Sequence, residues 1–250
     1  MPSPRIGAQT VAGRLLYVGH ATVLIELDGV RLLTDPVLRP RVWHLKRRVP
    51  LNTGELEGID AALVSHVHFD HFDRPSLRML GTDVTMIVPP GSRRLVRDFT
   101  DVREVDVGDE VRVGELTIQA IPAEHRSARL LRTSGPALGF VVSGSRRVYF
   151  AGDTDLFEGM SALAGSLDVA LLPVSGWGAK VGPGHLDPLR AAQSLRLLQP
   201  LVAIPIHWGT LSPLHRRTSS DPPEAFRRHA AELAPEVEVR ILEPGTELPL

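Results

Sequence analysis

The sequence contains no cysteine, and this absence excludes disulfide bridges and thiolate metal ligands. No stretch approaches the roughly 18 consecutive apolar residues of a membrane-spanning helix, and the first five residues lack the apolar core of a secretory signal. We therefore expect a soluble, cytoplasmic protein without a transmembrane segment.

Net charge and aromatic residues are also scarce. The formal net charge is −1, so no overall field draws the chain to nucleic acid or to an anionic membrane. Only 5% of the residues are aromatic, and no aromatic-basic platform is visible, which argues against a nucleic-acid-processing enzyme or binder. The remaining composition is ordinary for a globular protein, and we expect a single domain over residues 1–250.

Histidine, by contrast, is concentrated in one stretch. Directly after the apolar run 61–64, this stretch holds three histidines and two aspartates, namely His66, His68, Asp70, His71 and Asp73. A short apolar run followed by polar residues is typical of a buried strand that carries side chains to a site at its end. Three neighbouring histidines are a costly arrangement without a shared cation. Imidazole and carboxylate are ligands that zinc, iron and manganese accept, so the stretch predicts a metal site.

More donors follow other predicted strands. His125 comes after the strand 116–121, Asp153 after 147–150, and His207 after 201–206. Seven donors exceed one tetrahedral site, whereas two ions that share one carboxylate would use them all. The division we expect is His66, His68 and His125 on one ion, Asp70, His71 and His207 on the other, and Asp153 bridging the two. Such a pair of ions produces hydroxide near neutral pH and needs no serine nucleophile.

The coarse plan of the chain is two rounds of meander strands followed by strand-helix alternation. Predicted helices cover residues 74–80, 92–99, 160–164, 188–199 and 222–233. Between them, the segment 37–50 is basic and has no acid; its cations are Arg39, Arg41, Lys46, Arg47 and Arg48. This segment is either a plain solvated loop or a rim that draws in an anionic substrate.

The pattern His-x-His-x-Asp-His at 66–71, followed by His125, Gly152-Asp153-Thr154 and His207, resembles the metal signature of the metallo-β-lactamase-fold hydrolases. This resemblance implies an α/β fold, a four-layer αββα sandwich of two similar halves with these loops along one edge. Within the superfamily, the chain is most similar to the branch of the N-acyl-phosphatidylethanolamine-hydrolysing phospholipase D and the L-ascorbate-6-phosphate lactonase. The segments that carry this similarity are 19–23, 33–36, 150–154, 185–188 and 206–210.

The resemblance also implies roles outside the ligand set. His20 and Asp35 are expected behind the ligands, near the metals, and His185 is expected to face the substrate. Trp177 and His215 are further candidates for contact with the substrate, because they lie in loops near this edge.

Together these features predict a hydrolase with two divalent metal ions, most typically Zn2+, with Mn2+ or Fe2+ as alternatives. Asp70 would orient a metal-bridging hydroxide, and His185 would bind the substrate or protonate the leaving group. The expected partner is an anionic small molecule, with a phosphodiester as the preferred class and a lactone or another carboxylic ester as the alternative. A homo-oligomer is compatible with the sequence.

Overall fold

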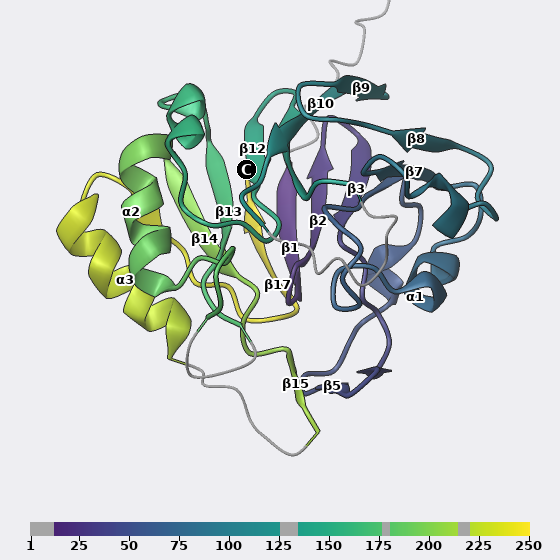
Figure 1. Cartoon of the computed structure of the whole chain (residues 1–250), viewed down its shortest axis with the longest axis horizontal. Coiled ribbons are helices and arrows are strands. Elements are labelled where there is room, and N and C mark those ends of the chain that lie inside the picture. The colour runs from purple at the N-terminus through teal and green to yellow at the C-terminus, as the bar shows by residue number, and fades with distance from the viewer. Residues whose placement is uncertain (1–12, 126–134, 177–180, 215–220) are drawn as a thin grey trace, which may run out of the picture.

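The structure is a computed structural model that describes residues 13–125, 135–176, 181–214 and 221–250. Two seven-stranded sheets lie face to face, with helices on the outside (Figure 1). In spatial order, the first sheet contains β17 (Thr246–Pro249), β1 (Arg14–Gly19), β2 (Thr22–Leu27), β3 (Val30–Thr34), β6 (Ala61–Leu63), β7 (Thr85–Val88) and β8 (Val102–Glu104). The second contains β16 (Glu238–Val239), β14 (Val202–Ile206), β13 (Val169–Pro173), β12 (Arg147–Phe150), β11 (Leu138–Ser143), β10 (Leu116–Pro122) and β9 (Glu110–Val113).

Each sheet combines an antiparallel part with a parallel part. Strands β3, β6, β7 and β8 run parallel in the first sheet, as do β12, β13, β14 and β16 in the second. Strands β6 and β13 are buried along their whole length, as expected for parallel strands covered on both faces. Because parallel strands end at the same edge of a sheet, the loops that follow β3, β6, β12 and β14 share an edge of the sandwich.

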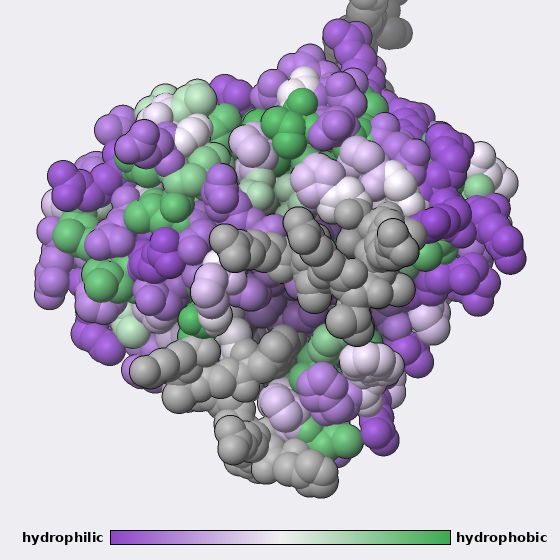
Figure 2. Space-filling model, viewed as in Figure 1, coloured by the Kyte–Doolittle hydropathy of each residue, from purple (hydrophilic) through white to green (hydrophobic). Residues whose placement is uncertain are grey.

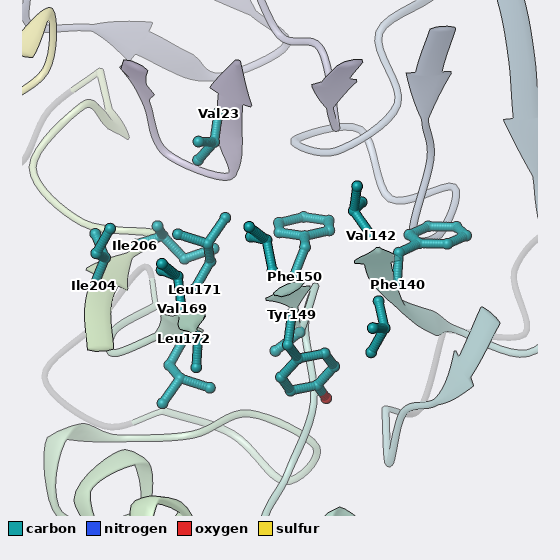
Figure 3. Close-up of a cluster of buried hydrophobic side chains, with 14 of the residues drawn as sticks. Val23, Phe140, Val142, Tyr149, Phe150, Val169, Leu171, Leu172, Ile204 and Ile206 are labelled. Carbon is teal, nitrogen blue, oxygen red and sulfur yellow. The ribbon is translucent and has the colours of Figure 1, made fainter. Parts of the chain in front are cut away.

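The main core lies between the sheets and is contributed by alternate residues of their strands. Figure 3 shows this alternation: Phe150 and Leu171 point towards the strand that carries Val23, whereas Tyr149 and Leu172 point to the opposite side. The visible outer surface is largely hydrophilic, with apolar residues in small groups (Figure 2). Most apolar residues of the strands are therefore buried between the layers.

The outer layers complete an αββα sandwich. Helices α2 (Pro188–Leu198) and α3 (Pro222–Leu233) pack on each other and against the second sheet, and α1 (Arg74–Met79) lies on the side of the first sheet (Figure 1). A separate apolar cluster joins Leu77 of α1 to the outward side chains of β1, β3, β6 and β7. In the described ranges, 3₁₀ helices occur at η1 (Gly54–Leu56), η2 (Arg93–Leu95) and η3 (Glu158–Leu163). The fold predicted from the resemblance is thus confirmed.

The prediction of a helix over 92–99 is wrong, since only the 3₁₀ turn η2 forms there. The backbone N–H of Arg93 donates to Glu104 Oε1 at 2.7 Å, and the Arg93 guanidinium donates to the carbonyl of Val102. Both partners belong to β8, which ties the segment to this strand. The segment's own backbone bonds are of the 3₁₀ type, such as that from the Val96 N–H to the Arg93 carbonyl.

The basic segment 37–50 is not a plain solvated loop. It contains β4 (Arg41–Val42) and β5 (Leu45–Arg47), which form a small sheet with β15 (Leu211–Pro213) below the sandwich in Figure 1. Arg39 bonds both carboxylate oxygens of Asp73, at 2.8 and 2.7 Å, and Arg47 is buried. Arg39 is therefore neutralised by an ion pair, and Arg47 is not part of a solvent-facing rim.

Strand β17 was not anticipated either. It pairs antiparallel with β1 from Arg14 to Tyr17 and closes that edge of the first sheet. Among the helices of the described residues, none has the length and apolar character that a membrane crossing requires.

Candidate metal centre

The seven predicted ligands meet at the edge where the parallel strands end. The loop after β6 carries four of them, His207 directly follows β14, and Asp153 lies three residues after the end of β12. His125 arrives from β10 of the second sheet. Sheet topology thus gathers side chains that are up to about 140 positions apart in the chain, since His66 and His207 lie at one site.

The first group contains three histidines whose ring nitrogens converge. His66 Nε2 lies 2.9 Å from His68 Nδ1, and His125 Nε2 lies 3.1 Å from the same His68 nitrogen. A carboxylate oxygen of Asp153 lies 3.9 Å from His66 Nε2. Ligand atoms around a tetrahedral zinc ion, at about 2.0–2.1 Å from the metal, lie roughly 3.3 Å apart. The spacing of this group is close to that value.

The second group contains Asp70, His71 and His207, all buried. His71 Nε2 lies 3.2 Å from His207 Nε2, and Asp70 Oδ2 lies 3.6 Å from each of these two nitrogens. The geometry again brings lone-pair donors together from two separate loops.

Asp153 lies between the two groups. Its Oδ2 approaches His71 Nε2 at 3.2 Å in addition to His66, and its Oδ1 lies 3.4 Å from His207 Nε2. Oδ1 is buried and accepts no hydrogen bond within the described part of the chain. A buried carboxylate oxygen without a partner is costly, and a cation at this position would satisfy it.

The outer nitrogens of two candidate ligand rings indicate which ring atoms are free to bind a cation. His125 Nδ1 donates to the carbonyl of Gly184 at 2.7 Å, and His207 Nδ1 donates to the carbonyl of Ser175 at 2.8 Å. A carbonyl only accepts, so in the neutral rings the proton sits on Nδ1 and Nε2 carries a lone pair. The lone pair of His125 Nε2 then faces the His68 ring, and that of His207 Nε2 faces the His71 ring, as expected for atoms that share a cation. Hydrogen bonds from the outer ring nitrogen to a carbonyl typically hold histidine in the tautomer that binds a metal.

Asp35 orients ligands of both groups. It accepts from His71 Nδ1 at 2.7 Å, from the Ser65 hydroxyl at 2.6 Å and from the Ser65 backbone N–H at 2.7 Å. The Ser65 hydroxyl in turn accepts from His66 Nδ1 at 2.9 Å. One buried carboxylate thus reaches His71 directly and His66 through a serine. The family resemblance implied that Asp35 lies near the metals, but no role was predicted for Ser65, although it directly precedes the histidine signature.

Charge at the centre is consistent with bound cations. Burial lowers the pKa of His66 well below its usual value and that of His125 to about 4, which keeps both rings neutral and able to ligate. For His71, burial also acts downward, but Asp153 and Asp70 outweigh it and raise the pKa. The carboxylates therefore favour positive charge in the second group. Nitrogen and oxygen donors in this number fit two divalent cations.

His20 lies beside the second group. Its Nε2 is 3.2 Å from Asp70 Oδ2, its ring centroid is 3.9 Å from that of His207, and burial lowers its pKa to about 3. The neutral ring is placed to donate to Asp70. A backbone hydrogen bond also holds His20 next to His207, because the His207 N–H donates to the His20 carbonyl at 2.8 Å.

Gly152 allows Asp153 to approach the loop after β6. Its φ is +60°, and a Cβ atom there would lie 2.7 Å from Ser65 Cβ and 2.9 Å from the Leu138 carbonyl oxygen. Only glycine fits both the backbone conformation and the space. The Gly-Asp pair seen in the sequence is therefore a packing requirement of the centre.

His185 stands at the open side of the centre. Its Nε2 lies 3.4 Å from Asp153 Oδ2, its ring centroid is 4.7 Å from that of His125, and its side chain is 27% exposed. A cavity of about 420 Å³ opens nearby, lined by Ala123, Glu124, His125, Asp155, Pro183 and Gly184. Trp177 and His215, the other two candidates for substrate contact, lie outside the described residues.

Most of this chain is similar to known proteins. Residues 30–208 match the family described as the Beta-lactamase superfamily domain. A UPF0173 metal-dependent hydrolase of Methanopyrus kandleri is 34% identical, over 93% of this chain and 97% of the relative. N-acyl-phosphatidylethanolamine-hydrolyzing phospholipase D 1 of Caenorhabditis elegans is 30% identical, over 78% of this chain and 63% of that enzyme.

Among solved structures, a metallo hydrolase from Ignicoccus hospitalis superposes with a TM-score of 0.73 at 24% identity. The match covers 96% of this chain and 99% of that one. At this identity the likeness concerns the fold.

Proposed function

This chain belongs to the metal-dependent hydrolases of the beta-lactamase superfamily, and we propose that it hydrolyses a phosphodiester with the aid of two divalent cations. The observation that carries the proposal is the pair of donor groups that share Asp153, whose Oδ1 is buried without a hydrogen-bond partner in the described residues. His66, His68 and His125 would hold one cation, Asp70, His71 and His207 the other, with Asp153 between them. Bound there, the cations would acidify a water and polarise the bond under attack.

The residues around the cations do the positioning. Asp70 accepts from His20, which leaves its carboxylate fixed in direction, and it can accept a hydrogen bond from the attacking water. Asp35 holds the rings of His71 and His66 in register and so keeps the two groups at a constant separation. Water is thereby oriented by groups whose own bonds are already made, which lowers the reorganisation needed during reaction.

His185 is proposed to bind the substrate and protonate the leaving group. Its Nδ1 donates to the carbonyl of Gly182 at 3.3 Å, which directs Nε2 towards the centre. The side chain of His185 is partly exposed, whereas the candidate ligands of the second group are buried. A substrate that enters the centre therefore contacts His185 before it reaches them. The phosphodiester class rests on the similarity to the Caenorhabditis elegans enzyme, and zinc is proposed as the metal because histidine nitrogens predominate among the candidate donors.

The test combines metal analysis with two substrates. We expect about two metal ions per chain, cleavage of bis(p-nitrophenyl) phosphate, and loss of this activity after chelation with recovery when zinc is returned. A simple lactone serves as the second substrate. Cleavage of the lactone alone would replace the phosphodiester by a carboxylic ester as the substrate class. A protein that binds no metal even on reconstitution would contradict the proposal as a whole.

Replacing His185 by alanine is expected to lower kcat by about 10²-fold, the range typical of a general acid, while the metal content stays unchanged. The loss should grow with the basicity of the leaving group, because a phenolate such as p-nitrophenolate leaves with little help from a proton. Aryl phosphodiesters with leaving groups of graded pKa provide the measurement. An equal loss for every leaving group would leave His185 as a binding residue only.

A further inference from the structure

The loop that follows β12 contacts two other loops beside the metal centre. It carries Asp155, which lies two residues after Asp153 and lines the cavity of about 420 Å³ next to His125. The side chain of Asp155 is 19% exposed. It belongs to none of the donor groups that the described residues form, so it is not a candidate ligand. Its hydrogen bonds nevertheless reach the backbone that orients His125.

Gly184 is the residue through which Asp155 reaches His125. The Gly184 N–H donates to Asp155 Oδ2 at 3.2 Å, and the Gly184 carbonyl accepts from His125 Nδ1 at 2.7 Å. Gly184 is buried, and its φ of +85° is a left-handed conformation that favours glycine. Because glycine has the freest backbone, a bond that fixes its N–H also limits the directions in which its carbonyl can point.

Backbone bonds join the same loop to the residue that precedes His125. The Asp155 N–H donates to the Glu124 carbonyl at 2.9 Å, and the Glu124 N–H donates to the Thr154 hydroxyl at 2.9 Å. His125 is therefore held in two ways. Residues 154 and 155 fix the backbone next to it, and Gly184 fixes the outer nitrogen of its ring.

Arg190 fixes the carboxylate of Asp155. Its guanidinium forms an ion pair with Asp155 Oδ1, which also accepts from the Leu156 N–H at 2.8 Å. Arg190 lies in the first turn of α2, where the helix dipole disfavours a cation and where α2 has no acidic residue of its own. The ion pair with Asp155 offsets this unfavourable position. With Oδ1 bound in this way, Oδ2 faces the Gly184 N–H.

We propose that Asp155 is a positioning residue that sets the cation affinity of the first donor group, by fixing Gly184 as the acceptor for His125. A fixed acceptor holds the ring in one orientation and one tautomer, and loss of such support typically lowers metal affinity by about 10–100-fold. In the part of the chain that the structure describes, no hydrogen bond or ion pair of Asp155 reaches the second group. The inference rests on the cation sites of the proposed function, but not on the phosphodiester as substrate.

The test measures the binding of Zn2+ to chelated protein in two backgrounds. His207→Ala disables the second group and keeps the first, whereas His68→Ala does the reverse. Asp155→Ala is expected to weaken the ion in the His207→Ala background by about 10–100-fold. It should leave the affinity in the His68→Ala background unchanged. A general loosening of the fold would instead weaken both ions alike, and this result would overturn the proposal.

Asp168→Ala is the matched control. Asp168 also accepts a backbone N–H, from Arg147 at 2.7 Å, and pairs with an arginine, Arg146, at 3.4 Å, but these contacts lie at the start of β12. Asp155→Asn is the conservative variant, and it should recover most of the affinity, because an amide oxygen can accept from the Gly184 N–H. Equal affinities for Asp155→Ala and Asp168→Ala would contradict the proposal, as would an Asp155→Asn variant as weak as Asp155→Ala.

A measurement without metal separates this proposal from the proposed function. In the chelated protein, the nitrogen chemical shifts of the His125 ring show which nitrogen carries the proton. We expect the proton on Nδ1 in the wild type and a mixture of both tautomers in Asp155→Ala. A wild type that binds no cation would refute the proposed function, and the tautomers of His125 would then decide the role of Asp155. An unchanged tautomer balance in Asp155→Ala would exclude that role.

Discussion

Replacing Asp153 by asparagine is expected to lower phosphodiester hydrolysis by at least about 10³-fold, or about 4 kcal/mol in transition-state stabilisation. Asp153 approaches His71 and His66 with one oxygen and His207 with the other, so it contacts both donor groups. An amide has the same shape but no charge, and its NH₂ group cannot ligate a cation. Both metal sites should therefore lose affinity together.

The measurement is the metal content per chain together with kcat. Asp98→Asn is the control, since Asp98 is a carboxylate paired with Arg78 and Arg74 on the surface, and it should change neither quantity. Metal titration of the Asp153→Asn variant should show weakened binding of both ions. A variant that keeps two ions and its full rate would refute the assignment of Asp153 as the shared ligand.

Replacing Asp35 by alanine is expected to affect both stability and metal binding. The change removes the acceptor of three hydrogen bonds and leaves the Ser65 N–H, the Ser65 hydroxyl and His71 Nδ1 unsatisfied in a fully buried site. Loss of one partner from such a buried charged network typically costs about 3–5 kcal/mol. Loss of a second-shell partner typically lowers metal affinity by about 10–100-fold, and here it should do so for both ions.

Chelated and metal-loaded forms separate these two effects, because unfolding of the chelated protein by urea reports stability alone. The Ser65→Ala variant separates the effects on the two groups. It removes the hydroxyl that joins Asp35 to His66 and keeps the hydrogen bond between Asp35 and His71. It should weaken mainly the ion of the first group. As a control for loss of an aspartate that accepts a backbone N–H, Asp60→Ala removes only the bond from Arg31, worth about 1 kcal/mol. Equal loss of both ions in Ser65→Ala would contradict the proposed route from Asp35 to His66.

Most of the candidate centre could be predicted from the sequence because its parts are local. Four ligands lie within six positions of one loop, and the others follow apolar runs that read as strands. The resemblance to the metallo-β-lactamase-fold hydrolases then predicted how these segments are arranged in an αββα sandwich. Gly152 and Asp153 were recognisable as a pair, although the reason for the glycine, its closeness to Ser65, is a tertiary contact.

Elements that depend on distant partners were not predictable in the same way. At 92–99 the chain forms only a short 3₁₀ turn, and its Arg93 bonds to Glu104 and Val102 of β8. The last strand of the chain, β17, pairs with β1, which lies more than two hundred positions earlier. Local propensity contains no information about either partner.

By itself, the sequence determined the kind of chemistry available: candidate nitrogen and oxygen ligands without thiolates, placed after strands that follow one another in a recognisable order. Only the tertiary structure decided which groups orient the candidate ligands. His125 and His207 donate to the backbone carbonyls of Gly184 and Ser175, and every residue type has such a carbonyl. The tertiary structure also decided that Arg47, one of five similar cations in a basic segment, is buried beside a cavity. Burial and charge compensation arise from the packing of distant segments, and no local pattern of residues encodes them.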